Sequence, residues 1–256
     1  MTVNIGPGVL ATPALRDCLV RADEIAAAAG THVVYDATTG CPHLVQHILE
    51  FGPERCAPRA PGACDEVLFV LSGHGLLHLA GETHALEPEA GATIRPGESY
   101  ELEATGGAPL VVHSVTVPAP PTDVETLERR VVVRLADQEA RAATGAREFR
   151  VVTDPHVGCP SVTQFVGYIP PGRAPDHFHT YDEVIFVLEG EGTLHLGEHH
   201  EPFGRGSCIH LTPRLIHSLE NRGAATMRVL GIFRPAGSPA EAYYPDGTLA
   251  FYSPDE

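Results

Sequence analysis

The chain has 256 residues, of which 43% are hydrophobic, so it is long enough for one large domain or two ordinary domains with a substantial core. Its 33 acidic and 17 basic residues give a net charge of −16, which disfavours nucleic acid and anionic membrane surfaces as partners. The 26 glycines and 23 prolines indicate many turns and favour an all-β protein with short strands.

The start of the sequence and the cysteines bear on the cellular location. The first residues lack a basic region followed by an apolar stretch, so no secretory signal is evident. No apolar run reaches the ~18 residues that a membrane helix needs. The six cysteines are scattered without a CxxC pair, which is typical of reduced thiols. We therefore expect a cytoplasmic protein without membrane partners.

An internal repeat organises the chain. The pattern Val-Val-x-Asp-x3-Gly-Cys-Pro begins at Val33 and again 118 residues later at Val151. The pattern Asp-Glu-Val-x-Phe-Val-Leu-x-Gly begins at Asp65 and again 117 residues later at Asp182. A single one-residue gap reconciles the two spacings, so the sequence predicts two copies of one structural unit.

Each copy reads as a series of short strands closed by glycine or proline. In chain order, strands are expected at 67–71, 77–79, 184–188, 194–196, 206–211 and 228–233. Such closely spaced strands indicate a sandwich or a barrel. The Pro-rich stretch that opens at Pro118 is typical of a linker. We therefore expect an N-terminal barrel in 1–117, a linker in 118–130, and a C-terminal barrel with a tail in 131–256.

The second copy contains four residues that are typical metal ligands. His177 and His179 are two positions apart, so on an extended strand both imidazoles face the same side. Glu183 follows after a short turn, and His217 is expected on a strand that folds back across the barrel. The alternative is an exposed histidine pair and a histidine packed in the core. The sequence predicts one divalent ion on these four residues, and the ligand set suits Mn²⁺, Fe²⁺, Ni²⁺ or Zn²⁺.

The spacing of these residues resembles the first motif of the cupin superfamily. The run His177-x-His179-x3-Glu183-x6-Gly190 matches that motif without a gap. Gly172 precedes His177 by one residue fewer than is usual in the family, a difference that a turn can absorb.

A second stretch resembles the second cupin motif. Gly206, His217 and Asn221 fall in place, whereas Thr212 and Arg214 replace the proline and the glycine of the motif. By this resemblance, the metal ligands of the family carry over to the four residues named above. With the repeat, the resemblance covers about residues 31 to 236 and implies a bicupin, an all-β protein of two tandem jelly-roll barrels.

The first barrel departs from the motifs at its ligand positions. Ala60, Gly62 and Tyr100 stand opposite the three histidines of the second copy, and only Glu66 remains opposite the glutamate. One carboxylate is a weak ligand set, so we expect a degenerate barrel without metal. A different site in this barrel would draw on three residues that are near in sequence, Cys56, Cys64 and His74.

Two further side chains are candidates for contact with a substrate. Tyr181 precedes Glu183 by two residues, so it shares the ligand face on an extended strand, although core packing would also explain it. Arg173, in the loop before the histidines, would meet an anionic substrate, although a solvated arginine is the simpler interpretation. Tyr181 and Glu183 are the predicted catalytic residues, Glu183 as a base that leaves the metal transiently.

The ligand set resembles those of quercetin dioxygenase and acireductone dioxygenase. This resemblance implies a mononuclear metal-dependent dioxygenase, an oxidoreductase that acts on a chelating enol or diketone-type small molecule. The two-barrel layout also resembles (S)-ureidoglycine aminohydrolase, although that family uses Glu, His, His and Gln as ligands, so an aminohydrolase, isomerase or lyase is the first alternative. The second alternative is a non-enzymatic cupin that binds a small ligand. Single cupins dimerise, so a homo-oligomer is a further possibility.

Overall fold

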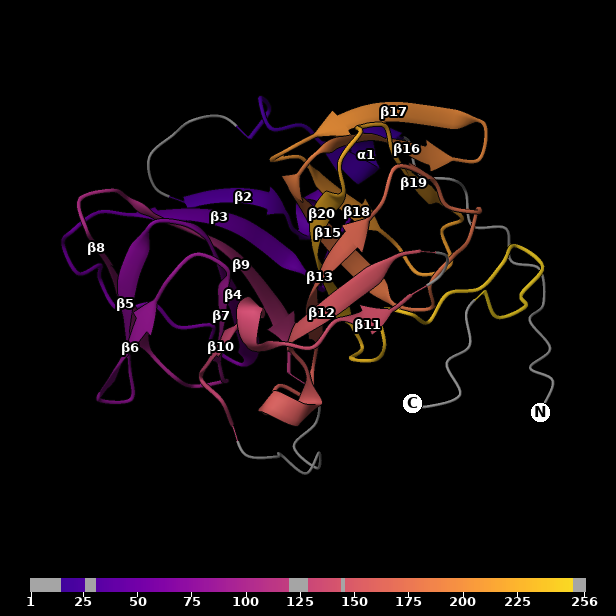
Figure 1. The fold of residues 1–256 in the computed structure, drawn as a ribbon. Coiled ribbons are helices and arrows are strands. Elements are labelled where there is room, and N and C mark those ends of the chain that lie inside the picture. The colour runs from indigo at the N-terminus through magenta and orange to yellow at the C-terminus, as the bar shows by residue number, and fades with distance from the viewer. Residues whose placement is uncertain (1–14, 26–30, 120–128, 144–145, 251–256) are drawn as a thin grey trace.

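The structure is a computed structural model that describes residues 15–25, 31–119, 129–143 and 146–250. Its strands form two barrels, the first drawn in indigo to magenta and the second in rose to yellow (Figure 1). The architecture is all-β with two tandem jelly-roll barrels, which confirms the predicted fold class. No helix within the described residues is long and apolar enough to cross a membrane.

The first barrel consists of a six-stranded sheet and a three-stranded sheet, in which every neighbouring pair is antiparallel. The larger sheet contains, in spatial order, β10 (Val132–Arg134), β7 (Ala90–Ile94), β4 (Cys64–Ser72), β9 (Leu110–Pro118), β3 (Val45–Phe51) and β2 (Thr31–Tyr35). The smaller sheet contains β6 (Glu82–Leu86), β5 (His74–Leu79) and β8 (Tyr100–Thr105). Apolar side chains such as Leu68, Leu77 and Leu102 are fully buried in this barrel and fill its interior.

The second barrel repeats this plan with one more strand in each sheet. Its larger sheet contains β1 (Leu19–Val20), β18 (Cys208–Leu211), β15 (Asp182–Glu189), β20 (Met227–Arg234), β13 (Thr163–Ile169), β12 (Glu148–Thr153) and β11 (Arg141–Ala142). Its smaller sheet contains β14 (Gly172–Arg173), β19 (Ser218–Asn221), β16 (Glu191–Leu196) and β17 (His199–Gly204). The expected strands 184–188, 194–196 and 228–233 lie inside β15, β16 and β20.

Two short strands are exchanged between the barrels. The helix α1 (Leu15–Cys18) leads into β1, which pairs with β18 of the second barrel, although it precedes the first barrel in sequence. In return β10, which precedes the second barrel and leads into the 3₁₀ turn η2 (Leu135–Asp137), pairs with β7 of the first barrel. Strands of two or three residues carry no sequence pattern of their own. The sheets therefore interlock across the sequence boundary that we placed at 118–130.

The repeated pattern Asp-x3-Gly-Cys forms the same capped turn in both barrels. Asp36 accepts backbone N–H bonds at the start of η1 (Ala37–Thr39), and Asp154 does so at the start of η3 (Pro155–Val157). Each turn ends at a glycine with a positive φ, Gly40 at 83° and Gly158 at 89°. Glycine adopts this left-handed conformation without steric cost, so the repeat preserves the turn.

The two larger sheets pack against each other across one continuous apolar core. Fully buried members of this core come from both barrels, among them Val67, Phe69 and Val115 from the first, and Val184, Leu230 and Ile232 from the second. The Tyr35 hydroxyl crosses the contact and donates to the carbonyl oxygen of Cys208 at 3.1 Å. Because side chains of both barrels share one core, neither barrel buries its larger sheet without the other.

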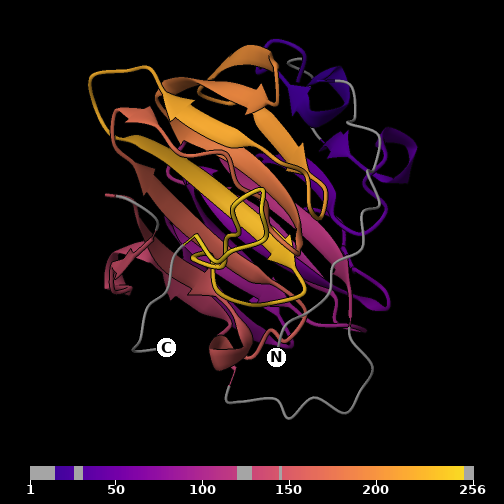
Figure 2. The ribbon, with the colours of Figure 1, turned by 90° about the vertical axis from the view of Figure 1, so that its right-hand side faces the viewer.

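The chain after β20 folds back over the second barrel, where it is drawn in yellow (Figure 2). Tyr243 forms an isolated antiparallel bridge with Phe178, with N–O distances of 2.9 and 3.0 Å in the two directions. The two rings also stack, with centroids 5.6 Å apart. The sequence predicts only a tail here and no position for it. The structure makes this C-terminal segment part of the wall around the candidate site.

Candidate metal centre

The three predicted histidine ligands come together in the second barrel. His177 and His179 are in the segment between β14 and β15, and His217 directly precedes β19. His177 and His217 form an isolated antiparallel bridge, in which each N–H donates to the carbonyl oxygen of the other at 3.0 and 2.8 Å. The carbonyl oxygen of His179 accepts the N–H of Arg214 at 2.7 Å. Backbone hydrogen bonds therefore hold all three residues in place.

The three imidazoles converge on one point. One ring nitrogen of each lies within 4.8 Å of those of the other two. The Nδ1 atoms of His177, His179 and His217 contact the carbonyl oxygens of Pro175, Glu241 and Leu215 at 2.8, 2.7 and 2.8 Å. A carbonyl oxygen only accepts, so each Nδ1 carries the hydrogen and each Nε2 is left with a free lone pair. Such partners orient metal-binding histidines, so the donor set fits a divalent ion.

The surroundings keep these imidazoles neutral, which is the form that binds a metal ion. Burial lowers the pKa of His179 to about 3, and the charges of neighbouring groups act in the same direction. Burial also lowers the pKa of His177 and, more strongly, that of His217. The structure therefore brings together a His-rich site of the kind that the sequence predicts.

The fourth predicted ligand, Glu183, lines the same cavity but lies outside the 4.8 Å histidine group. It is the second residue of β15 and is 3% exposed. Burial, and then the charge of Asp182, raises the pKa of its carboxyl group to about 8. A Cβ added at Gly231 would lie 2.9 Å from its Oε1, so the absence of a side chain there leaves room beside the carboxylate. Its role as a ligand stays a prediction.

The predicted catalytic residue Tyr181 packs directly against His179. Its ring stacks on His179, with centroids 4.6 Å apart, and on Phe233, with centroids 3.9 Å apart. Its hydroxyl is buried with no hydrogen-bond partner among the described residues, and the residue lines the cavity. Burial, and then the charge of Glu183, raises the pKa of Tyr181 well above its usual value, so the hydroxyl stays protonated and is free to donate.

The cavity is closed by elements that the sequence did not connect with the site. Its walls are mainly apolar, with Phe149, Phe165, Ile169, Ile185, Leu211 and Val229 among them. The C-terminal segment contributes Pro239, Ala242, Tyr244 and Ala250 to the wall. Arg147, which the sequence did not single out, also lines the cavity, whereas the candidate Arg173 is exposed and pairs with Asp176 at 2.6 Å. No sequence signal marks Arg147, because it is a single arginine directly ahead of β12.

In the first barrel, side chains occupy the equivalent position. Glu66 accepts hydrogen bonds from the hydroxyls of Tyr100 at 2.9 Å and Ser114 at 2.5 Å. Arg59 donates from Nε to the Tyr100 hydroxyl at 3.2 Å. Tyr100 is thus the residue opposite His217, and its phenol satisfies the carboxylate that aligns with Glu183. Ser114 aligns with Gly231, which explains why the two carboxylates have such different surroundings.

A second group of metal-ligand type lies between the barrels. Cys41, Asp182 and His210 are buried and place their ligand atoms within 4.8 Å of one another. His210 Nε2 is already hydrogen-bonded to Asp182 at 2.8 Å, and the Cys41 thiol donates to the Leu44 carbonyl oxygen at 3.2 Å. Burial, and then Asp182, raises the pKa of Cys41 to about 12, so the thiol stays protonated. A protonated thiol is a poor ligand, and we interpret this group as interface packing.

We therefore expect one ion per chain, held by the histidine group. Elemental analysis of the purified, metal-loaded protein should give one equivalent in the unaltered chain and in Cys41→Ala. The matched variant His217→Ala should bind less than one equivalent, because it loses a ligand. Two equivalents in the unaltered chain, or a loss of metal in Cys41→Ala, would contradict this prediction.

Comparison with known proteins supports the class of fold. Residues 165–233, within the second barrel, match the Cupin domain family. Over 74 residues the chain is 34% identical to Auxin-binding protein 1 from Arabidopsis thaliana, which corresponds to 25% of this chain and 37% of that protein. The match thus spans little more than a third of that relative.

Solved structures extend the similarity to both barrels. Oxalate decarboxylase from Bacillus subtilis matches 92% of this chain and 85% of its own, with a TM-score of 0.68 and 11% identity. Salicylate 1,2-dioxygenase from Pseudoaminobacter salicylatoxidans matches 75% of this chain and 71% of its own, with a TM-score of 0.61 and 13% identity. At these identities the similarity shows the fold, which is that of two tandem cupin barrels.

Proposed function

We propose that the second barrel is the site of a mononuclear metal-dependent enzyme of small-molecule metabolism, and within that class a dioxygenase acting on a chelating enol or diketone-type substrate. The observation that supports it is the convergence of three neutral imidazoles, each held by a backbone carbonyl, on one point in a mostly apolar cavity. The proposed cofactor is one divalent ion of Mn, Fe, Ni or Zn.

We assign roles in metal binding, proton transfer and substrate binding to individual residues of the site. When bound, the ion would supply a Lewis acid with positions left for an oxygen chelate. Glu183 is proposed as the fourth ligand and as the base that takes the proton of an enol, since its carboxyl group is buried and lines the same cavity as the histidines. The Tyr181 hydroxyl, which has no partner among the described residues, is proposed to donate a hydrogen bond to a substrate oxygen. The apolar walls and the C-terminal segment exclude water from the reacting groups.

Among metal reactions, we favour the dioxygenase on two grounds. Three histidines with one glutamate resemble the ligand sets of the quercetin and acireductone dioxygenases, and one enzyme with a similar fold is, by its name, a salicylate dioxygenase. A hydrolase, isomerase or lyase would use the same site without O2, and the similarity to an oxalate decarboxylase keeps a lyase as the alternative enzyme. The match to Auxin-binding protein 1, whose name describes a binding protein, supports a non-enzymatic ligand binder as the second candidate.

An oxygen-dependence experiment separates these functions. The protein, loaded in turn with Fe, Mn, Ni or Zn, would be incubated with chelating diketones, enediols and ureido compounds with and without O2. For a dioxygenase we expect one O2 consumed per substrate, and ¹⁸O2 should place both labelled atoms in the products. Equal turnover without O2 would favour the hydrolase, isomerase or lyase, and saturable binding without any product would favour the binder.

A further inference from the structure

One charged side chain of the cavity has no counter-charge among the described residues. Arg147 precedes β12 and lines the same cavity as the three histidines. Its Nη2 donates to the carbonyl oxygen of Leu219 at 2.7 Å, which uses one of its five N–H groups. Across the described residues, no carboxylate forms an ion pair with it. Other arginines of the chain do have such partners, namely Arg129, Arg134, Arg173 and Arg228.

Arg147 keeps its positive charge although its side chain is largely buried. Burial lowers the pKa of Arg147 to about 10, so the guanidinium is still protonated at neutral pH. Arg147 lines the same cavity as His177, His179 and His217, so it lies near the ligand group. Glu183 lines the same cavity, but no ion pair joins its carboxyl group to Arg147 in the described part of the chain. A poorly solvated cation without a partner is costly unless an anion joins it.

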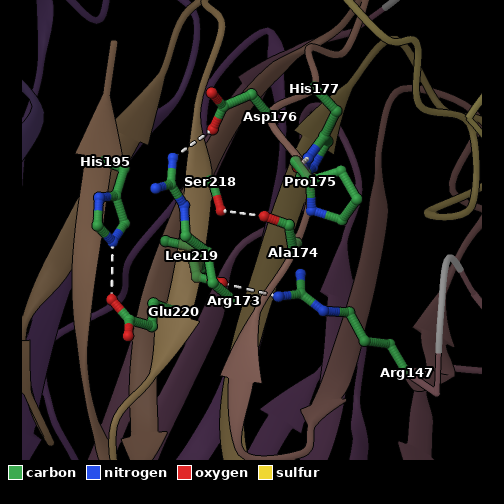
Figure 3. Close-up of polar contacts among 10 residues, drawn as sticks. All are labelled: Arg147, Arg173, Ala174, Pro175, Asp176, His177, His195, Ser218, Leu219 and Glu220. Atoms are coloured by element: carbon green, nitrogen blue, oxygen red, sulfur yellow. Dashed lines mark hydrogen bonds and ion pairs between the residues drawn. The ribbon is translucent and has the colours of Figure 1, made fainter. Parts of the chain in front are cut away.

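The geometry ties this cation to the histidines. Leu219, which accepts its hydrogen bond, is two residues beyond His217, and two residues of extended chain span about 7 Å. In Figure 3 the Arg147 side chain reaches from one side of the site toward Leu219, beneath Pro175 and His177. Arg173 lies on the other side of Ala174 and is already bonded to Asp176. In the described part of the chain, Arg147 is thus the cation of the site that has no ionic partner, and a planar guanidinium suits a planar carboxylate.

We propose that Arg147 anchors a carboxylate group of the ligand, so that the site takes a chelating acid, such as a 2,4-dioxo acid, in preference to the uncharged diketone. This inference rests on the proposed function, because the chelating end of the same molecule is assigned to the metal. It narrows the substrate class from chelating diketones in general to those with a carboxylate beyond the chelating oxygens.

The experiment compares two ligands that differ only in charge. Titration calorimetry would measure the binding of 2,4-dioxopentanoate and its methyl ester to the full chain loaded with zinc, which is redox-inert. We expect the acid to bind about 10- to 100-fold more tightly than the ester, as is typical of a charge-assisted hydrogen bond. In Arg147→Met this preference should vanish while the zinc content and the affinity for the ester stay unchanged. Arg147→Lys should keep part of the preference.

The controls separate this inference from the proposed function. Arg173→Gln removes an exposed arginine on the neighbouring loop and should leave both affinities unchanged. Equal binding of acid and ester by the unaltered chain, or a preference that survives in Arg147→Met, would overturn the role of Arg147 while the metal site still stands. Inorganic phosphate that binds more tightly than the acid, in an Arg147-dependent way, would overturn the assignment to carboxylates. Failure of the chain to bind zinc at all would instead refute the proposed function.

Discussion

Replacement of His179 by alanine is expected to abolish metal binding and activity while the barrels stay folded. Its Nε2 is one of three convergent donors, and changes to residues that merely support a ligand already cost about 10- to 100-fold in metal affinity. Loss of a ligand itself should therefore weaken binding by more than about 100-fold. Metal titration and elemental analysis would measure this loss directly, and product formation would fall with it.

The fold should survive because His179 lies in the segment between β14 and β15, outside the strands of both sheets. The change leaves the Glu241 carbonyl oxygen without its donor, which costs about 1–3 kcal/mol, and it removes one face of the stack on Tyr181. Circular dichroism should be unchanged, and the midpoint of thermal unfolding should fall by less than about 10 °C. His199→Ala, at an exposed position in the same barrel, is the matched control and should keep both metal and activity. Full metal occupancy in His179→Ala would contradict the proposed ligand set.

The parts of the site that follow a local pattern could be predicted from the sequence. Two histidines two positions apart on extended backbone must face one side, and the second motif then supplied His217, which the structure pairs with His177. The repeat likewise predicted equivalent strands in both barrels, because apolar runs closed by glycine are themselves the strands. In these cases one short segment contains all the information that the contact needs.

Other parts depend on contacts that no residue type signals. His179 is oriented by the backbone carbonyl of Glu241, 62 positions away, and any residue has such a carbonyl. Arg147 is held by the carbonyl of Leu219, 72 positions away, so its isolated place in the sequence gave no reason to choose it over Arg173. Only the closed barrel, with its C-terminal segment folded back, brings these groups together.

The second large effect concerns the degenerate first barrel: residues 125–256 expressed alone should be insoluble or should dimerise, with weakened metal binding. The fragment would expose the sheet face that now packs against the first barrel, including Val184, Leu230 and Ile232, which are fully buried. Burial of one such side chain contributes about 1.5–3 kcal/mol, and a whole domain is stable by only about 5–15 kcal/mol. Exposure of a few of them is therefore enough to offset the stability of the fragment. Size-exclusion chromatography and metal titration would measure the outcome.

Because the barrels exchange strands, each half of the chain lacks a strand that the other half contains. Supplying the missing half is therefore the control. The fragment lacks β1, so β18 would present an open edge, while β10 would have no β7 to pair with. Co-expression of 1–124 and 125–256 as separate chains supplies both missing partners and should restore a soluble 1:1 complex that binds metal as the intact chain does. A soluble, monomeric 125–256 with native metal affinity would show that the first barrel is dispensable. If only the co-expressed pair binds metal, the N-terminal half is needed because it completes the sheet and the core that support the histidine site.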